Sequence, residues 1–186
     1  MKHILTGGPC TGKTSVLEEL ARRGHRTVPE SARDLIAHEQ AKAQANPQYT
    51  GILPWTDMVA FEEQLMYRQL GAEKTSADFL DRALPDILAY CKVASIQPPK
   101  GLHNHIARAE YGYVFVFDRL PYAQDGERKE DDDLGQRIHD TLIETYKSLR
   151  MPVVYVPVFP GTKEESIRAR ADYVLNHISY RMQRAG

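Results

Sequence analysis

Short runs of apolar, mostly β-branched or aromatic residues alternate along the chain with longer segments in which apolar residues recur at helical spacing. The short runs predict strands over residues 3–6, 26–29, 78–81, 113–118 and 153–158. Strands that alternate with helices are typical of a parallel sheet wrapped by helices. The pattern therefore predicts an α/β fold of three layers, with a five-stranded parallel sheet flanked by helices.

The helical segments are separated by clear breaks. The first helix is expected to begin in a glycine-rich loop and to end at Gly24, with Val16, Leu17 and Leu20 on one face. Further helices are predicted over residues 31–45, 56–70, 85–96, 101–109, 133–150 and 163–182. A Pro- and Gly-containing stretch, 46–54, interrupts two of them. We expect one domain over 1–186, in which residues of about 45–75 form an insertion that holds an acceptor substrate.

Composition and charge narrow the class of protein. Of the 186 residues, 42% are hydrophobic and 26% charged, as in an ordinary globular domain. The net charge of −1 is too small to gather polyanions, which disfavours a nucleic-acid partner, since dedicated nucleic-acid binders are usually more basic. No apolar run has the length of a membrane span, and no signal peptide is evident. Two distant cysteines, Cys10 and Cys91, favour a reducing, cytoplasmic setting.

The glycine-rich loop matches the full P-loop pattern, in which a glycine and four residues precede Gly-Lys-Thr. Its glycines let successive N–H groups converge on a phosphate, and the following helix adds its partial positive charge. The lysine is expected to reach the β- and γ-phosphates of ATP, and the threonine hydroxyl to ligate Mg²⁺. The residues expected to bind the nucleoside triphosphate are Gly7, Gly8, Pro9, Cys10, Thr11, Gly12, Lys13, Thr14 and Ser15.

Polar residues follow two other predicted strands at the edge where ligands bind in a parallel sheet. Glu30 either accepts the proton of an attacking hydroxyl or stabilises the start of a helix, and its position leaves both readings open. Asp81 holds the Walker-B position, where an acid completes the Mg²⁺ site begun by Thr14, while Arg82 is expected to clamp phosphate or substrate. Asp86 fits the first turn of a helix.

A polar loop follows the fourth strand, and residues of about 119–135 are expected to form a lid over the phosphates. Arg128 is our first candidate for a lid arginine that neutralises charge during transfer. Arg168 and Arg170 belong to the last predicted helix. From there they could approach the adenine or the phosphates of the nucleotide, but we expect them to lie on the exposed face of the helix.

These motifs occur in an order that covers nearly the whole chain, and together they resemble a known group. The chain is similar to the small AAA-type ATP-binding P-loop proteins related to the kinase domain of nicotinamide riboside kinases. The resemblance implies a kinase-like fold, ATP and Mg²⁺ as ligands, and an acceptor site over the second and third strands. Glu30, Asp81 and Arg82 also match places that deoxynucleoside kinases use for a base and an acid–arginine pair, although Ala83 stands where those kinases carry a serine.

The preferred function is a Mg²⁺-dependent kinase that moves the γ-phosphoryl group of ATP to a hydroxyl of a small metabolite, with a nucleoside-like molecule as one candidate. In this reading Lys13, Glu30, Asp81, Arg82 and Arg128 carry the chemistry. Two alternatives stay open: an NTPase switch that binds a protein or phospholipid partner, and a kinase that acts on polynucleotide ends.

Overall fold

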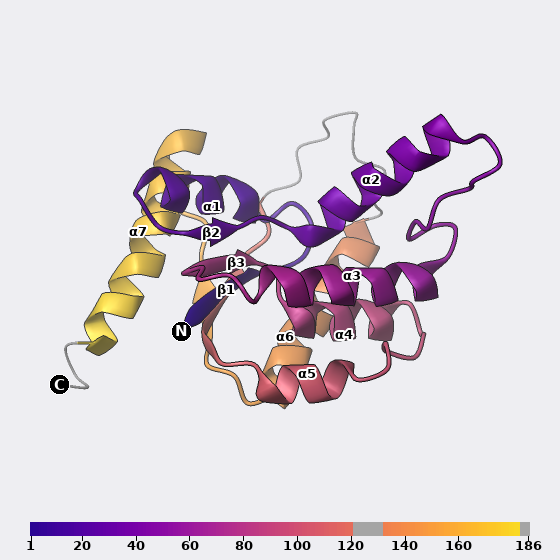
Figure 1. Ribbon diagram of the computed structural model, residues 1–186. Coiled ribbons are helices and arrows are strands. Elements are labelled where there is room, and N and C mark those ends of the chain that lie inside the picture. Colours follow the sequence, from indigo (N-terminus) through magenta and orange to yellow (C-terminus); the bar gives the residue numbers. More distant parts are fainter. Residues whose placement is uncertain (121–131, 183–186) are drawn as a thin grey trace.

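The computed structural model describes residues 1–120 and 132–182, in which a parallel five-stranded sheet lies between two layers of helices (Figure 1). The strand order is β2-β3-β1-β4-β5, and every neighbouring pair is parallel. The predicted three-layer α/β fold is therefore confirmed. The strands are β1 (Lys2–Thr6), β2 (Thr27–Val28), β3 (Phe79–Asp81), β4 (Tyr111–Phe117) and β5 (Val153–Val156).

Seven helices lie in the described part of the chain, and their bounds are close to those predicted. They are α1 (Lys13–Arg22), α2 (Ser31–Ala45), α3 (Met58–Ala72), α4 (Leu84–Val93), α5 (Leu102–Arg108), α6 (Asp132–Ser148) and α7 (Lys163–Met182). Helix α3 begins at Met58 rather than at Thr56, because the Asp57 side chain caps it by accepting a hydrogen bond from the Ala60 amide. None of these described helices is long and apolar enough to cross a lipid bilayer.

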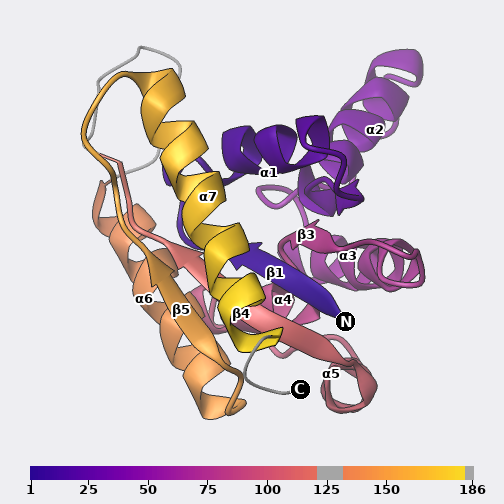
Figure 2. The ribbon, with the colours of Figure 1, turned by 90° about the vertical axis from the view of Figure 1, so that its left-hand side faces the viewer.

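Alternating strand residues supply two separate apolar cores. Leu5 and Phe115 point to the side of the sheet covered by α1 and α7, where Leu20 packs against them. Ile4 and Val114 point to the opposite side, which α4 and α6 cover. Figure 2 shows the two helical layers on either face of the sheet. Because both faces are covered, these central strand residues are fully buried, as expected for a parallel sheet.

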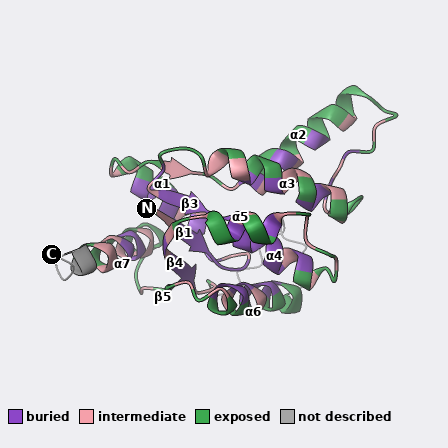
Figure 3. Ribbon diagram, turned by 60° about the horizontal axis from the view of Figure 1, so that its bottom comes forward, coloured by how far each residue is buried: buried purple, intermediate pink, exposed green. Residues whose placement is uncertain are grey.

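Helix α2 extends away from the sheet, and much of its surface is exposed (Figure 3). A buried carboxylate holds the returning segment against it. Glu39, with no exposed surface, accepts hydrogen bonds from Lys42 Nζ at 2.8 Å, from the Ile52 amide at 3.0 Å, and from the Tyr49 hydroxyl. This clasp fixes the path by which the chain returns from α2 to α3.

Candidate functional site

The phosphate loop joins β1 to α1 at the carboxyl edge of the sheet. Gly7 has a φ of +137° and Gly12 a φ of +73°, values that favour glycine. A Cβ on Gly7 would also lie 2.8 Å from the Phe117 carbonyl oxygen, so the loop passes β4 too closely for a side chain. Both glycines permit the tight turn that the P-loop pattern requires.

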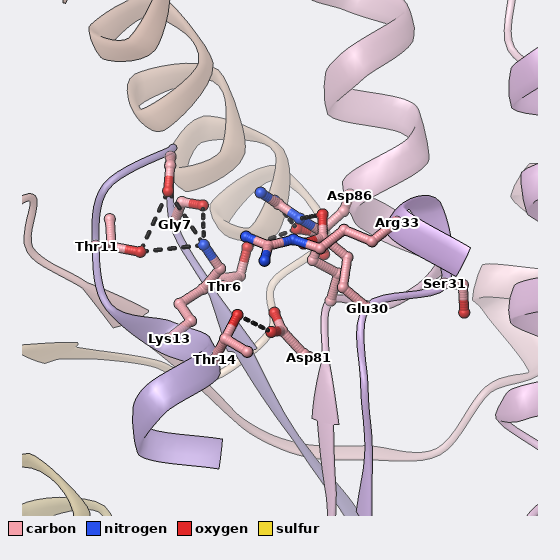
Figure 4. A network of polar contacts seen from close by, with 12 residues as sticks. Thr6, Gly7, Thr11, Lys13, Thr14, Glu30, Ser31, Arg33, Asp81 and Asp86 are labelled. Atoms are coloured by element: carbon pink, nitrogen blue, oxygen red, sulfur yellow. Dashed lines mark hydrogen bonds and ion pairs between the residues drawn. The ribbon is translucent and has the colours of Figure 1, made fainter. Parts of the chain in front are cut away.

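The phosphate loop curves around the ammonium group of Lys13. Its Nζ donates hydrogen bonds to the carbonyl oxygens of Gly7 and Gly8, each at 3.1 Å, and to Thr11 Oγ1 at 3.0 Å (Figure 4). The side chain is 7% exposed, and burial lowers the pKa of Lys13 to about 8, with the charge of Arg82 acting in the same direction. The loop therefore holds a cation whose charge is suited to meeting a phosphate.

Two distant helices fasten the loop from outside. The Gly8 amide donates to His139 Nδ1 of α6 at 3.2 Å, and a Cβ on Gly8 would lie 2.9 Å from the Gly135 carbonyl oxygen. Arg170 of α7 donates from Nη1 to the Thr11 carbonyl oxygen at 2.5 Å. Its other N–H groups donate to backbone carbonyls at the ends of β4 and β5, and the guanidinium lies 5.1 Å from the centre of the Phe117 ring.

Arg170 is thus a correction to the expected exposed position, since only 2% of it is exposed. Its place on α7 turns it toward the sheet, and its long side chain reaches carbonyl groups that the strands leave unpaired at their ends. Arg168 on the same helix is exposed, as expected.

Thr14 and Asp81 form the second part of the site. Thr14 Oγ1 donates to Asp81 Oδ2 at 3.1 Å, while Asp81 Oδ1 is buried and has no hydrogen-bond partner among the described residues. Burial raises the pKa of Asp81, whereas the charges of Lys13 and Arg82 lower it. An unpaired carboxylate oxygen beside a hydroxyl is a donor set that fits Mg²⁺.

No three His, Cys, Asp or Glu side chains converge on a metal site within residues 1–120 and 132–182. Mg²⁺ in nucleotide sites keeps several waters and is held by one or two protein oxygens together with substrate phosphates. The Thr14 hydroxyl and the Asp81 carboxylate are the groups that would hold such an ion.

Glu30 and Arg82 form the third part. Arg82 Nε donates to Glu30 Oε1 at 2.7 Å, and Arg82 Nη1 donates to Asp86 Oδ1 at 3.1 Å. Burial acts to raise the pKa of Glu30, but the charges of Arg82 and Lys13 hold it below its ordinary value. Arg82 has a left-handed backbone with a φ of 68°, which costs a non-glycine residue about 1–2 kcal/mol. The ion pairs offset this cost and hold Glu30 at the site.

Asp86 connects the Glu30–Arg82 pair to the rest of the fold. Its carboxylate accepts hydrogen bonds from Thr6 Oγ1 at 2.6 Å, from the Ala83 amide at 3.0 Å and from the Tyr146 hydroxyl, in addition to Arg82. It therefore caps α4, as its place in the first turn predicts, and also joins β1, α4 and α6. The sequence carries no signal for the last role, since Thr6 and Tyr146 are remote from it in the chain.

A cavity of about 590 Å³ opens beside Glu30 and Arg82. It lies among α2, α3, α4 and α6, and most of its wall is apolar, with Ile36, Pro54, Trp55, Phe61, Leu65 and Tyr90 among the lining residues. Sequence reasoning placed an acceptor site in this part of the chain but did not identify Glu62, a buried acid that also lines the cavity.

The predicted site residues fall into two groups. Lys13, Thr14, Glu30 and Asp81 converge at one edge of the sheet, although they come from the phosphate loop and the ends of β2 and β3 (Figure 4). Arg82 joins them through its ion pair with Glu30. The predicted lid arginine, Arg128, lies outside the described residues and stays a prediction, as does most of the lid.

Comparisons with known proteins agree with this geometry. The sequence profile of a family described as AAA domain matches residues 2–165. No curated protein matches the sequence. A deoxyadenosine kinase from M. mycoides, with products dCMP and a flexible dCDP bound, has a similar structure with a TM-score of 0.62 at 12% identity, over 97% of this chain and 99% of that one.

Two further structures have the same fold. The NadR protein in complex with NR gives a TM-score of 0.64 at 18% identity, over 94% of this chain but 49% of that one, so this chain spans about half of its length. A thymidylate kinase from Ehrlichia chaffeensis gives 0.57 at 13% identity, over 96% of this chain and 98% of that one. Likeness at these identities establishes the fold. Because the family profile covers most of the sequence, the chain belongs to the AAA-domain family, with the fold of the P-loop nucleoside and nucleotide kinases.

Proposed function

We propose that the protein is a Mg²⁺-dependent kinase that transfers the γ-phosphoryl group of ATP to a hydroxyl of a small, nucleoside-like molecule. One observation carries this proposal. The phosphate loop, the Thr14–Asp81 pair and the Glu30–Arg82 pair share one edge of the sheet, next to a cavity of about 590 Å³.

The donor half of the reaction rests on the loop and on Lys13. Backbone N–H groups of the loop and the N-terminus of α1 favour bound phosphate. Lys13 Nζ now contacts two carbonyl oxygens and a hydroxyl, and these neutral acceptors are weaker partners for an ammonium group than phosphate oxygens. Lys13 is thus positioned to exchange them for the β- and γ-phosphates.

Thr14 and Asp81 are the residues that would hold Mg²⁺, through the Thr14 hydroxyl and the unpaired Oδ1 of Asp81. When bound, the ion neutralises charge between the phosphate groups. Burial raises the pKa of Asp81, and the charges of the nearby Lys13 and Arg82 oppose that shift.

Glu30 serves the acceptor half. Its lowered pKa keeps the carboxylate ionised at neutral pH, so it accepts a hydrogen bond from the acceptor hydroxyl and orients that oxygen toward the phosphoryl group. Arg82 fixes the position of Glu30 through the ion pair at 2.7 Å. Catalysis of this kind depends chiefly on positioning and on charge neutralisation.

The cavity favours a small acceptor over the two alternatives. Its volume lies within the roughly 300–1,000 Å³ of small-molecule sites. Its wall is mostly apolar, whereas a site for a polynucleotide end needs cations along the backbone. Two of the similar structures are a deoxyadenosine kinase and a thymidylate kinase, which supports a nucleoside-like acceptor.

The test is a phosphoryl-transfer screen with the full chain, ATP and Mg²⁺ against nucleosides, nucleotides, sugars and short oligonucleotides, read by mass spectrometry. We expect a nucleoside to gain one phosphoryl group and the Lys13→Ala variant to form no product. Transfer to oligonucleotides alone, or ATP hydrolysis without any transfer, would contradict the proposal.

A further inference from the structure

Glu62 is a buried acid in the cavity wall, and one of its carboxyl oxygens has no hydrogen-bond partner among the described residues. The residue is 1% exposed, its Oε2 is enclosed, and that atom has no hydrogen bond to any residue in the described ranges. Buried polar groups in folded proteins are nearly always paired, and an unpaired one costs about 1–3 kcal/mol. An unpaired acid on the wall of a cavity therefore indicates a group that forms a hydrogen bond with a bound ligand.

The helix that carries Glu62 shows how unusual this position is. Met58, Phe61 and Leu65 occupy neighbouring turns of α3 and line the same cavity with apolar groups. Gln69 is the other polar residue on this face, and it is fully engaged: it accepts from Ser31 Oγ at 2.8 Å and donates to the Arg82 carbonyl oxygen at 3.2 Å. Gln69 serves the fold, whereas Glu62 has no such contact.

The environment determines which form of the carboxyl group the cavity presents. Burial raises the pKa of Glu62 to about 8, the charge of Asp86 acts in the same direction, and Arg82 opposes both. At neutral pH the group is then a neutral acid, with an O–H donor beside a C=O acceptor. Its natural complement is a ligand edge that presents an acceptor and a donor side by side.

The charges around the cavity restrict the ligand further. Arg82 is the one cation among the described residues that line it, and Arg82 is already paired with Glu30 and Asp86. Within the described part of the wall, then, every cation is already paired, and this favours an acceptor without a phosphate. Trp55 and Tyr90 add aromatic surface, which suits a flat ring.

We propose that Glu62 is the specificity-determining residue of this cavity and pairs with the amide-like edge of an unphosphorylated nucleoside, where an N–H lies next to a carbonyl oxygen or ring nitrogen. The inference rests on the proposed function in placing the acceptor here. It adds the class of acceptor, a nucleoside rather than a nucleotide, and the residue that selects it.

The experiment compares nucleosides with counterparts that lack the edge, by calorimetric titration of the full chain without ATP. Adenosine is paired with purine riboside, cytidine with zebularine, and nicotinamide riboside with pyridinium riboside. We expect at least one parent nucleoside to bind about tenfold or more tightly than its counterpart, as the loss of a good hydrogen-bonded pair implies.

Three variants test the role of the side chain. Glu62→Leu is expected to remove the preference, because it offers neither donor nor acceptor. Glu62→Gln is expected to keep it, because the amide carries both. Glu63→Gln is the matched control, since Glu63 is the exposed neighbour on α3.

A wild-type chain that binds no parent nucleoside better than its counterpart overturns the inference, and so does a preference that survives in Glu62→Leu. Phosphoryl transfer, measured in parallel, separates the two proposals. A binding preference that depends on Glu62, without any phosphoryl transfer, supports this inference and contradicts the proposed kinase activity. Phosphoryl transfer to a nucleoside whose binding does not depend on Glu62 supports the kinase activity and contradicts this inference.

Discussion

Arg82 and Glu30 lie 52 positions apart in the chain, and yet their side chains meet at 2.7 Å between Nε and Oε1. The second carboxylate oxygen, Oε2, accepts from Arg33 Nε at 3.1 Å, and the Arg33 side chain is 72% exposed. One oxygen of Glu30 is thus held firmly inside the site, and the other meets a partner that water can replace. In the proposed kinase reaction, that second oxygen is the one that would accept the hydrogen bond of an acceptor hydroxyl.

Glu30→Gln should therefore slow phosphoryl transfer by about 100-fold or more, because an amide is a weaker acceptor for the hydroxyl than a carboxylate. ATP affinity should stay unchanged. Rates from quenched assays and ATP binding from calorimetry measure the two effects. Asp34→Asn, an exposed change in the same helix turn, serves as control. Full activity in Glu30→Gln would remove this residue from the mechanism.

ATP binding should become coupled to proton uptake above about pH 8. Burial lowers the pKa of Lys13 to about 8, so the free protein loses this charge at higher pH, whereas bound phosphates favour the ammonium form. The affinity for ATP should then fall with rising pH, by up to about tenfold per pH unit. Titrations at pH 9 in buffers of different ionisation enthalpy report the proton uptake. Equal heats in all buffers would rule out this titration of Lys13.

Asp81→Asn should raise the Mg²⁺ concentration needed for half-maximal transfer, on the order of tenfold or more, because it removes the charge of the unpaired oxygen. Thr14→Ser keeps the hydroxyl and should resemble the wild type. Initial rates at saturating ATP across a Mg²⁺ series measure the effect, and a chelator should abolish transfer. An unchanged Mg²⁺ dependence in Asp81→Asn would place the ion elsewhere.

Arg170→Leu should lower the free energy of unfolding by about 3 kcal/mol, because several backbone carbonyls lose a charged hydrogen-bond donor. ATP affinity should fall as well, since the Thr11 carbonyl is no longer held. Urea denaturation and calorimetry give the two quantities. The exposed Arg168→Leu is the matched control. Equal stability of the two variants would show that the contacts of Arg170 contribute little.

Glu62→Gln should stabilise the protein more at pH 8 than at pH 5. With a pKa of about 8 in the folded state and 4.5 as the ordinary value, the folded state binds more protons between these pH values, so wild-type stability falls as pH rises through that window. The variant lacks this loss, and its advantage at pH 8 should reach a few kcal/mol. Denaturation curves across the window test it. The other charged groups that face this cavity are Arg82, Asp86 and Glu30. A difference in stability between Glu62→Gln and the wild type that stays constant with pH would mean that Glu62 titrates normally.

The fold was predictable because its signals are local. The alternation of apolar runs with helical periods, read with the P-loop after the first strand, gave the sheet and the layers, and residues 31–45 and 163–182 form helices with the predicted bounds. Strand β2 is the weakest case, since only Thr27–Val28 is paired where residues 26–29 were expected. A short edge strand carries little pattern, and its extent depends on pairing with β3.

The site was predictable only where strand ends supplied it. Asp81 ends β3, Arg82 follows it, and Glu30 lies two residues after β2, so the parallel pairing of β2 with β3 brings the three together. Arg170, His139 and Glu62 come from helix faces, and their roles depend on which way each helix turns in the packed molecule. A helical period shows that one face is buried, but it does not show that a charged residue on this face meets a loop or a cavity.

The contact between Arg170 and Thr11 joins positions 159 residues apart, and this separation has a consequence for synthesis. A ribosome produces the phosphate-loop sequence early and the arginine that fastens it much later. The growing chain thus carries a recognisable nucleotide-binding motif long before the loop has all of its supports. The ability to hold ATP firmly should be among the last properties that the nascent protein acquires.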